Sequence, residues 1–174
     1  MIKAILYSSC TGSCKKYAQM MSEATGVPAY PVKEYKAKFP REKVAYVGWL
    51  FGGFVMGLGK ARVKGRVKAV CQVGMGPETP ALEPTARKKN CLPCKRVPVF
   101  YYQGAFNINA LPMPLKLIMK GKTKQIAAGL KQKEASTPLS DQEQATLTMA
   151  FTGNGDPAKW DISRFENWFN SKKK

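Results

Sequence analysis

Six consecutive small residues near the amino terminus have the composition of an anion-binding loop. They follow an apolar run at residues 2–7 and are Ser9, Cys10, Thr11, Gly12, Ser13 and Cys14. Small residues let backbone N–H groups turn inward, hydroxyls add donors, and a following helix contributes positive potential. The loop therefore predicts a phosphate cradle without a basic side chain, although it matches neither the Walker nor the dinucleotide pattern. The alternative is an ordinary turn in which Ser9 or Thr11 caps the helix.

Four of the five cysteines occur in two closely spaced pairs, Cys10 with Cys14 and Cys91 with Cys94. Four thiolates could bind zinc or an iron–sulfur cluster. One pair follows the first predicted strand and the other precedes the fifth, so the two pairs belong to opposite edges and we expect no metal site. The second pair is either a redox pair activated by basic neighbours or, as we favour, a surface turn around Pro93.

The overall composition excludes several classes of function. The chain contains no histidine, so Ser-His-Asp and Cys-His catalysis and His-ligated metals are excluded. Lys and Arg number 29 against 11 Asp and Glu, giving a formal net charge of +18. Such a charge attracts phosphates, acidic proteins, anionic lipid and nucleic acid. Nucleic acid is the weaker expectation, because no helix-turn-helix, RNP or zinc-finger pattern is present.

The 174 residues, 44% hydrophobic and 23% charged, predict one globular domain spanning residues 1–174. The amino-terminal segment lacks the features of a signal peptide, and the number of cysteines is odd, so we expect reduced thiols and a cytoplasmic protein. Uncharged stretches at residues 44–59 and 97–115 are interrupted by glycine or proline. Neither stretch is expected to span a membrane.

Strands and helices alternate along the chain. Apolar runs predict strands at residues 2–7, 27–32, 44–50, 67–73 and 97–102. The spacing of apolar residues such as Tyr17 and Met21 predicts a helix after the first loop. Helical spacing or composition predicts further helices at residues 60–68, 82–89, 115–133 and 161–169. A glycine-rich loop is expected at residues 51–59, a variable polar insert with a short helix after Ser140 at 134–157, and a basic tail at 171–174. This alternation predicts an α/β fold with helices on both faces of a parallel sheet.

The loop at residues 9–14 resembles the FMN-phosphate loop of flavodoxins, which runs Ser/Thr-x-Thr-Gly-x-Thr/Ser directly after the first strand. In this chain Cys14 replaces the final hydroxyl residue. The resemblance covers most of the chain and implies a three-layer fold with five parallel strands in the order 2-1-3-4-5. It also implies bound FMN.

The same resemblance implies two loops that contact the flavin ring. Residues 44–49 are similar to the third strand of flavodoxin-like proteins, and the residues at its end would lie against the isoalloxazine ring: Trp49, Leu50, Phe51 and Gly52. The loop after the fourth strand would supply Gly74, Met75 and Gly76. The alternative for Trp49 and Phe51 is that both are core aromatics.

Among flavodoxin-like proteins, the chain is most similar to the flavodoxin-type, quinone-dependent protoporphyrinogen oxidases. The resemblance is carried by residues 100–106, Leu111, residues 114–120 and the closing pattern Trp160-Asp161-x-x-x-Phe165-x-x-Trp168. Gln103 stands where an arginine is common. The resemblance implies an oxidoreductase that passes electrons through FMN to a quinone or a partner protein, with no evident side-chain acid or base. The alternatives are a flavodoxin-type electron carrier and a basic flavodoxin-shaped binding module without FMN.

A basic and apolar segment at residues 115–124 could lie on an anionic membrane surface. It combines Lys116, Lys120, Lys122 and Lys124 with Leu115, Leu117, Ile118 and Met119. We therefore expect peripheral association with the inner face of the membrane, where a membrane quinone would be accessible. The alternative is a solvated charged face.

Overall fold

The computed structural model describes the chain except residues 38–40, 93–95, 112, 156–159 and 173–174. Its central sheet contains five parallel strands in the order β2-β1-β3-β5-β6. Their bounds are Ala4–Ser8 for β1, Ala29–Pro31 for β2, Lys43–Phe51 for β3, Arg66–Gly74 for β5 and Val99–Gln103 for β6. A short strand β4, Phe54–Val55, pairs antiparallel with the end of β3. Without β4 the parallel strands follow the order 2-1-3-4-5, so the expected topology is confirmed.

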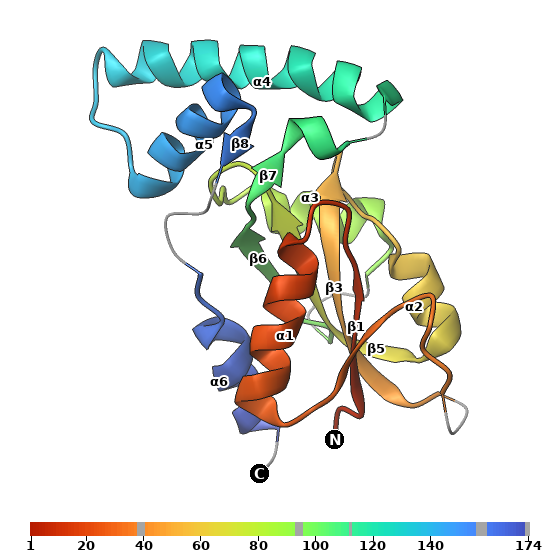
Figure 1. Cartoon of the computed structure of the whole chain (residues 1–174). Helices are drawn as coiled ribbons and strands as arrows, with labels where there is room; N and C mark the ends of the chain where they lie inside the picture. Colours follow the sequence, from red (N-terminus) through yellow and green to blue (C-terminus); the bar gives the residue numbers. More distant parts are fainter. Residues whose placement is uncertain (38–40, 93–95, 112, 156–159, 173–174) are drawn as a thin grey trace.

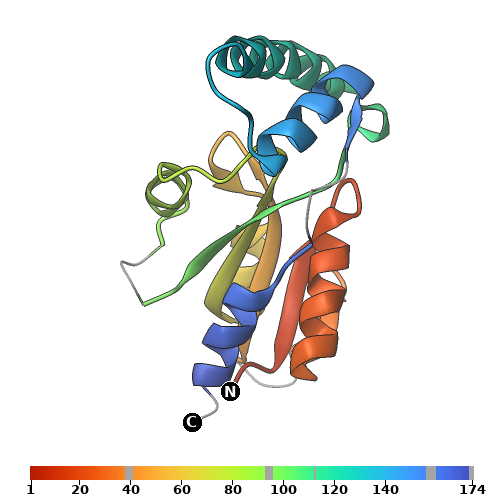
Figure 2. The same ribbon diagram turned by 90° about the vertical axis from the view of Figure 1, so that its left-hand side faces the viewer.

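Helices cover both faces of this sheet and complete a three-layer, flavodoxin-like α/β fold (Figures 1 and 2). Side chains of α1 and α6 pack on one face, and those of α2 on the other face, where α3 lies beside β6. The bounds are Ser13–Thr25 for α1, Leu58–Lys64 for α2, Leu82–Lys89 for α3 and Ser163–Ser171 for α6.

The middle strand β3 shows why its sequence is continuously apolar. Val44 and Tyr46 contribute to the core on the α2 side, whereas Ala45 and Val47 contribute to the core on the α1 and α6 side. All four are fully buried. A parallel strand covered by helices on both faces must bury alternate side chains in both directions, which requires an apolar run and not an alternating one.

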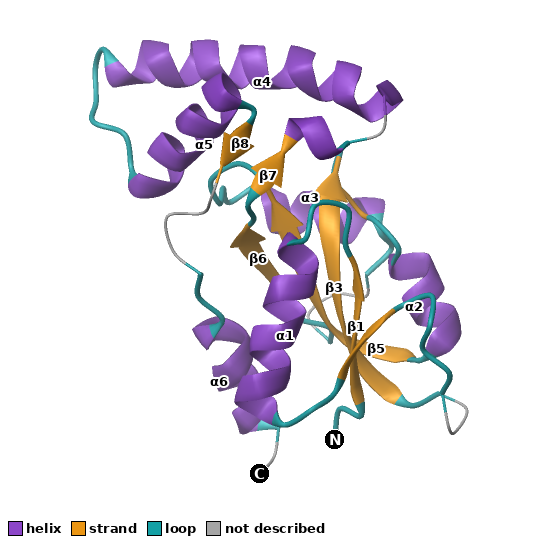
Figure 3. Cartoon of the chain, viewed as in Figure 1, coloured by secondary structure: helices purple, strands orange, loops and turns teal. Residues whose placement is uncertain are grey.

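Between β6 and α6 the chain forms a largely helical extension, residues 106–155, which we call the helical arm (Figure 3). It contains β7 Phe106–Asn107, the 3-10 helix η1 Ile108–Ala110, α4 Met113–Glu134, α5 Asp141–Thr152 and β8 Asn154–Gly155. Strands β7 and β8 pair antiparallel at its base. The arm lies beyond the carboxyl ends of the parallel strands, with α4 running across them at the extremity of the molecule (Figures 1 and 2).

The structure corrects three expected boundaries. The loop expected at residues 51–59 contains the β3–β4 hairpin, and the helix expected at 60–68 is α2, which ends at Lys64. Gly65 follows in an extended conformation, so residues 66–68 already belong to β5. The helix expected after Ser140 is confirmed, but α5 is long enough that little of the 134–157 insert is loop. A capping box between Ser140 and Glu143 begins it.

Phe165 tests the packing of α6 on the sheet. Its ring is fully buried and meets Phe100 edge-on at a centroid distance of 6.1 Å and Trp168 at 5.7 Å. We expect Phe165→Ala to lower the free energy of unfolding by about 3–5 kcal/mol, because it leaves a cavity in a packed core. The control is Phe151→Ala on the 60% exposed ring of α5, expected to cost less than about 1 kcal/mol. Equal losses in urea unfolding would contradict this packing.

The contact between α4 and α5 should depend on pH. Lys133 donates to the Glu143 carboxylate (Nζ to Oε1, 2.6 Å), and the Ser140 N–H donates to the same group. These bonds, that from Lys133 foremost, lower the pKa of Glu143 from 4.5 to about 2. A carboxyl whose pKa is lower when folded stabilises the fold above about pH 4.5 and loses this effect as the pH falls towards 2.

Comparison with Glu143→Gln isolates this carboxyl from all others. We expect the variant to be less stable than the natural chain at pH 6 in urea unfolding. The difference should shrink by pH 3. A difference that stays constant over this interval would show that the Glu143 charge contributes nothing to folding.

Candidate functional site

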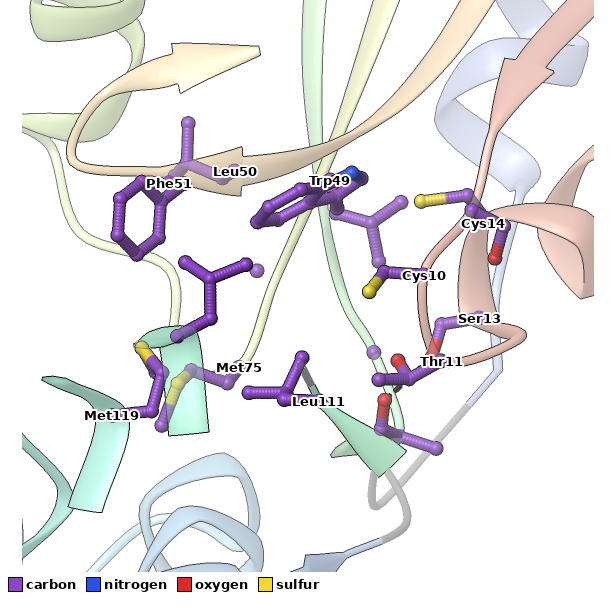
Figure 4. Close-up of a pocket in the computed structure, with 16 residues that line it drawn as sticks. Cys10, Thr11, Ser13, Cys14, Trp49, Leu50, Phe51, Met75, Leu111 and Met119 are labelled. Atoms are coloured by element: carbon purple, nitrogen blue, oxygen red, sulfur yellow. Dashed lines mark hydrogen bonds between the residues drawn. The ribbon is translucent and has the colours of Figure 1, made fainter. Parts of the chain in front are cut away.

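A pocket lies beyond the carboxyl ends of the parallel strands, beneath the helical arm (Figure 4). In doubly wound sheets ligands bind at this edge, where the strand order reverses on either side of β1. The lining comes from four strand ends and the arm and comprises Ser9, Cys10, Thr11, Ser13, Cys14, Trp49, Leu50, Phe51, Val73, Gly74, Met75, Gly104, Ala105, Leu111, Leu115 and Met119. Apolar side chains predominate, and the hydroxyl groups come from the loop between β1 and α1 and from the first residue of α1.

The β1–α1 loop leaves the amino end of α1 without a capping side chain. Gly12 occupies the N-cap position with φ of +99°, a conformation that favours glycine. Its N–H donates to Ser9 Oγ at 3.1 Å, which folds the loop over the start of the helix. Because the N-cap glycine has no side chain to accept from the first-turn N–H groups of α1, that turn keeps donors and positive potential for an anion.

Two side chains in the first turn of α1 have structural roles. The buried Ser13 hydroxyl donates to the Ala105 carbonyl at 2.5 Å and so ties the loop to the segment that follows β6. Cys14 is 1% exposed, and burial raises the pKa of its thiol to about 12. A neutral thiol is a weak donor. Ser9 and Thr11 are therefore the hydroxyl residues of the loop best suited to bind an anion.

Aromatic and thioether side chains form the walls of the pocket. Trp49 and Phe51 at the end of β3 lie with their ring centroids 5.9 Å apart and their planes tilted by 57°. Figure 4 shows Cys10 and Thr11 along one side of the pocket and Phe51 and Met119 along the other. The pocket therefore places an apolar environment next to the hydroxyl groups near the start of α1.

A buried hydrogen-bond network joins the loop after β5 to α5. The Met75 carbonyl accepts from Gln103 Nε2 and from Thr146 Oγ1, each at 3.2 Å. The two Gln103 Nε2 protons are shared among this carbonyl, Thr146 Oγ1 at 2.9 Å and the Gln142 carbonyl at 3.0 Å. The single Thr146 hydroxyl proton is shared between the carbonyls of Met75 and Gln142, the latter at 2.8 Å. Thr146 is fully buried. The arm thus holds Met75, one wall of the pocket, in a defined position.

The structure brings together the predicted site residues of all three loops. Each of them lines the pocket except Gly12, Gly52 and Gly76. Gly12 forms the turn of the loop at the N-cap position of α1. Gly52 has φ of +56° at the hairpin turn, and its carbonyl accepts from Lys89 Nζ at 2.5 Å. The Gly76 carbonyl accepts from the Tyr101 hydroxyl and lies outside the lining.

Sequence reasoning did not assign the rest of the lining to the site. These residues are Val73, Gly104, Ala105, Leu111, Leu115 and Met119. The last three come from the helical arm, which folds back over a pocket formed mainly by earlier residues. The four-residue spacing of Leu115 and Met119 was the available signal, but it indicates only a common helical face. It does not show which part of the protein that face covers.

The cysteines do not form a cluster in the described residues. Cys14 and Cys71 are buried, whereas Cys10 and Cys91 are exposed. Pro93 and Cys94 lie outside the described residues, so both the favoured surface turn around Pro93 and the alternative redox pair stay predictions. The described part of the chain holds no group of three or more Cys, Asp or Glu side chains arranged to bind a metal.

Comparisons with known proteins give no closer assignment. No known protein family matches the chain, and no curated protein matches it either. Over the residues that the structure describes, no helix combines the length and apolar character needed to cross a membrane.

Thr146 tests whether α5 holds the Met75 loop. We expect Thr146→Val to lower the free energy of unfolding by about 1–2 kcal/mol, because it removes the buried hydrogen bonds to Met75 and Gln103. Valine has nearly the volume of threonine, so the substitution leaves no large cavity. Thr148→Val, on the exposed side of the same helix, is the matched control and should change stability by less than about 0.5 kcal/mol. Urea unfolding measures both. If both variants match the natural chain, the network does not stabilise the fold.

Proposed function

We propose that this chain binds FMN non-covalently in the pocket and transfers electrons through it. The observation that carries the proposal is one pocket with two chemically distinct ends. One end is the uncapped start of α1 with two suitable hydroxyls, and the other is an apolar slot walled by Trp49 and the arm. Phosphate and isoalloxazine are the two groups of FMN that need these environments.

The residues present fit this cofactor. A Cβ built at Gly12 would meet no atom within 4 Å, so no other part of the described chain covers the turn of the loop at this residue. Ser9, Thr11 and the first-turn N–H groups of α1 would hold the phosphate. Trp49 and Met119 would border the ring, and the Met75 loop, braced by α5, would offer backbone groups to its polar edge. Cys14 contributes little to phosphate binding, because its thiol is buried and neutral.

When bound, FMN would supply the capacity to accept and release one or two electrons. The chain's own contribution is to orient the cofactor, exclude water from it and tune its environment. The described lining contains no carboxylate, lysine or arginine, and its ionisable groups are the thiols of Cys10 and Cys14. Proton transfers would therefore involve solvent and not a protein acid or base.

An oxidoreductase of the protoporphyrinogen-oxidase-like group is the finer hypothesis, with a quinone or a protein as electron acceptor. Its support is the resemblance of residues 100–106 and 114–120, which flank the pocket from β6 and the arm. A flavodoxin-type electron carrier is the alternative. Oxidation of a porphyrinogen by the FMN-loaded protein would favour the enzyme over the carrier, and failure to retain FMN would leave a basic binding module.

The affinities for FMN and for riboflavin, compared in the same variants, distinguish the phosphate end of the pocket from the ring end. We expect Ser9→Ala with Thr11→Ala to weaken FMN binding about tenfold to a hundredfold, because hydrogen bonds to a phosphate are lost. Riboflavin carries no phosphate, so its affinity should not change. Ser22→Ala, near the other end of α1, is the matched control and should bind both ligands normally.

Flavin fluorescence and visible absorbance measure the affinities. A natural chain that retains no FMN would overturn the redox proposal. Equal weakening of FMN and riboflavin by the double variant would instead contradict the assignment of the phosphate to the β1–α1 loop.

A further inference from the structure

The helix α4 presents an uncovered face at the extremity of the molecule. Its 22 residues span about 33 Å at 1.5 Å per residue. Figures 1 and 2 show α4 lying crosswise beyond the strand ends, with α5 on its inner side. A flat surface could therefore approach α4 along much of its length without meeting the sheet or the other helices.

The outward face of α4 exposes large apolar side chains. Met113 is 75% exposed and Leu117 74%, and the neighbouring Ile118 is half exposed. At about 100° per residue, Leu117, Gly121 and Ala128 fall on nearly the same line along the helix. The buried residues of α4, among them Met119, lie on the opposite side. Exposure of large apolar residues in a row is unusual for a free surface and marks a contact site.

Lysines border this apolar line on one side. Residues 113–133 contain six lysines and no Asp or Glu. By helical position, Lys120, Lys124 and Lys131 lie along one side of this line or within it, whereas Lys122 and Lys133 lie towards the inner side, where Lys133 pairs with Glu143 of α5. Lys120 and Lys124 are exposed and have no acidic partner among the described residues. An exposed apolar line with cationic side chains beside it is a pattern found in helices that lie in a lipid interface.

We propose that the outward face of α4 binds the surface of an anionic lipid bilayer. Met113 and Leu117 enter the boundary between headgroups and acyl chains, and the flanking lysines contact lipid phosphates. A second copy of this chain fits poorly, because two such faces would bring lysines against lysines. An acidic protein satisfies the charge, but an apolar line along a protruding straight helix matches a planar lipid interface better.

This orientation has a consequence for the pocket. Leu115 and Met119 line the pocket from the same helix whose outer side carries Leu117. A helix is about 10 Å across, so the pocket would lie within roughly that distance of the headgroups. The lipid proposal rests on the surface of α4 alone and not on the cofactor. If the pocket holds a flavin, a lipid-dissolved electron acceptor would have a short path to it.

Vesicle co-sedimentation of the full chain tests the proposal. We expect binding to vesicles of phosphatidylglycerol with phosphatidylcholine at low salt, weaker binding at high salt, and little binding to phosphatidylcholine alone. Lys120→Gln with Lys124→Gln should weaken binding roughly 30-fold, since each lysine near an anionic surface contributes a factor of about five. The control, Lys3→Gln with Lys36→Gln, changes the net charge equally at exposed sites outside the arm and should weaken it much less.

A second pair of variants tests the apolar contact. Leu117→Gln should weaken vesicle binding several-fold. The control Val63→Gln alters an 87% exposed side chain of α2 and should not. These sites are exposed, so all variants should keep the circular dichroism and flavin retention of the natural chain, which separates this test from that of the cofactor.

Three outcomes would overturn the proposal. The first is no binding of the natural chain to anionic vesicles at low salt, which would leave an acidic protein as the partner. The second is equal loss in both lysine variants, which would show that the overall charge and not α4 is responsible. The third is a dimer in sedimentation velocity that Leu117→Gln dissociates, which would show that a second copy covers this face.

Discussion

Burial of the parallel sheet on both faces is the constraint on which the rest of the structure depends. Helices α1 and α6 cover one face and α2 and α3 the other, so neither face can receive a ligand. What remains open is the carboxyl edge, where loops must leave the strands and where backbone N–H groups at the start of α1 lack partners within the helix. The pocket lined by the β1–α1 loop and Trp49 lies at this edge.

The helical arm converts this open edge into an enclosed site. Its inner residues Leu111, Leu115 and Met119 close the apolar end of the pocket. The arm is held in turn by the polar network of Gln103 and Thr146 at the Met75 carbonyl. Buried hydrogen bonds of this kind restrict the position of the arm, because a shift would leave further polar atoms unpaired beside Gln103 Oε1, which is buried without a partner among the described residues. The same arm that these hydrogen bonds attach to the sheet also closes the apolar end of the pocket.

The positive charge of this molecule lies outside the described lining of the pocket. The described lining of the pocket contains no lysine or arginine, although the whole chain has a net charge of +18. The basic residues lie on outer surfaces, α4 among them, where they set which partners approach the protein. Anion binding within the pocket would instead rely on backbone dipoles and hydroxyl groups, which need no counter-charge when the site is empty.

The sequence by itself determined the α/β class, the strand order through its resemblance, and the three loops that meet at the pocket. Runs such as residues 44–50 and the small residues 9–14 carry these features locally, because strand burial and helix starts depend on neighbouring residues. Only the tertiary structure decided that Leu115 and Met119 face the pocket, that Ser13 holds Ala105, and that Gln103 binds Thr146. Those contacts join segments about 40 or more residues apart. Local periodicity gives the face of a helix, whereas the identity of what it covers depends on how the whole chain packs.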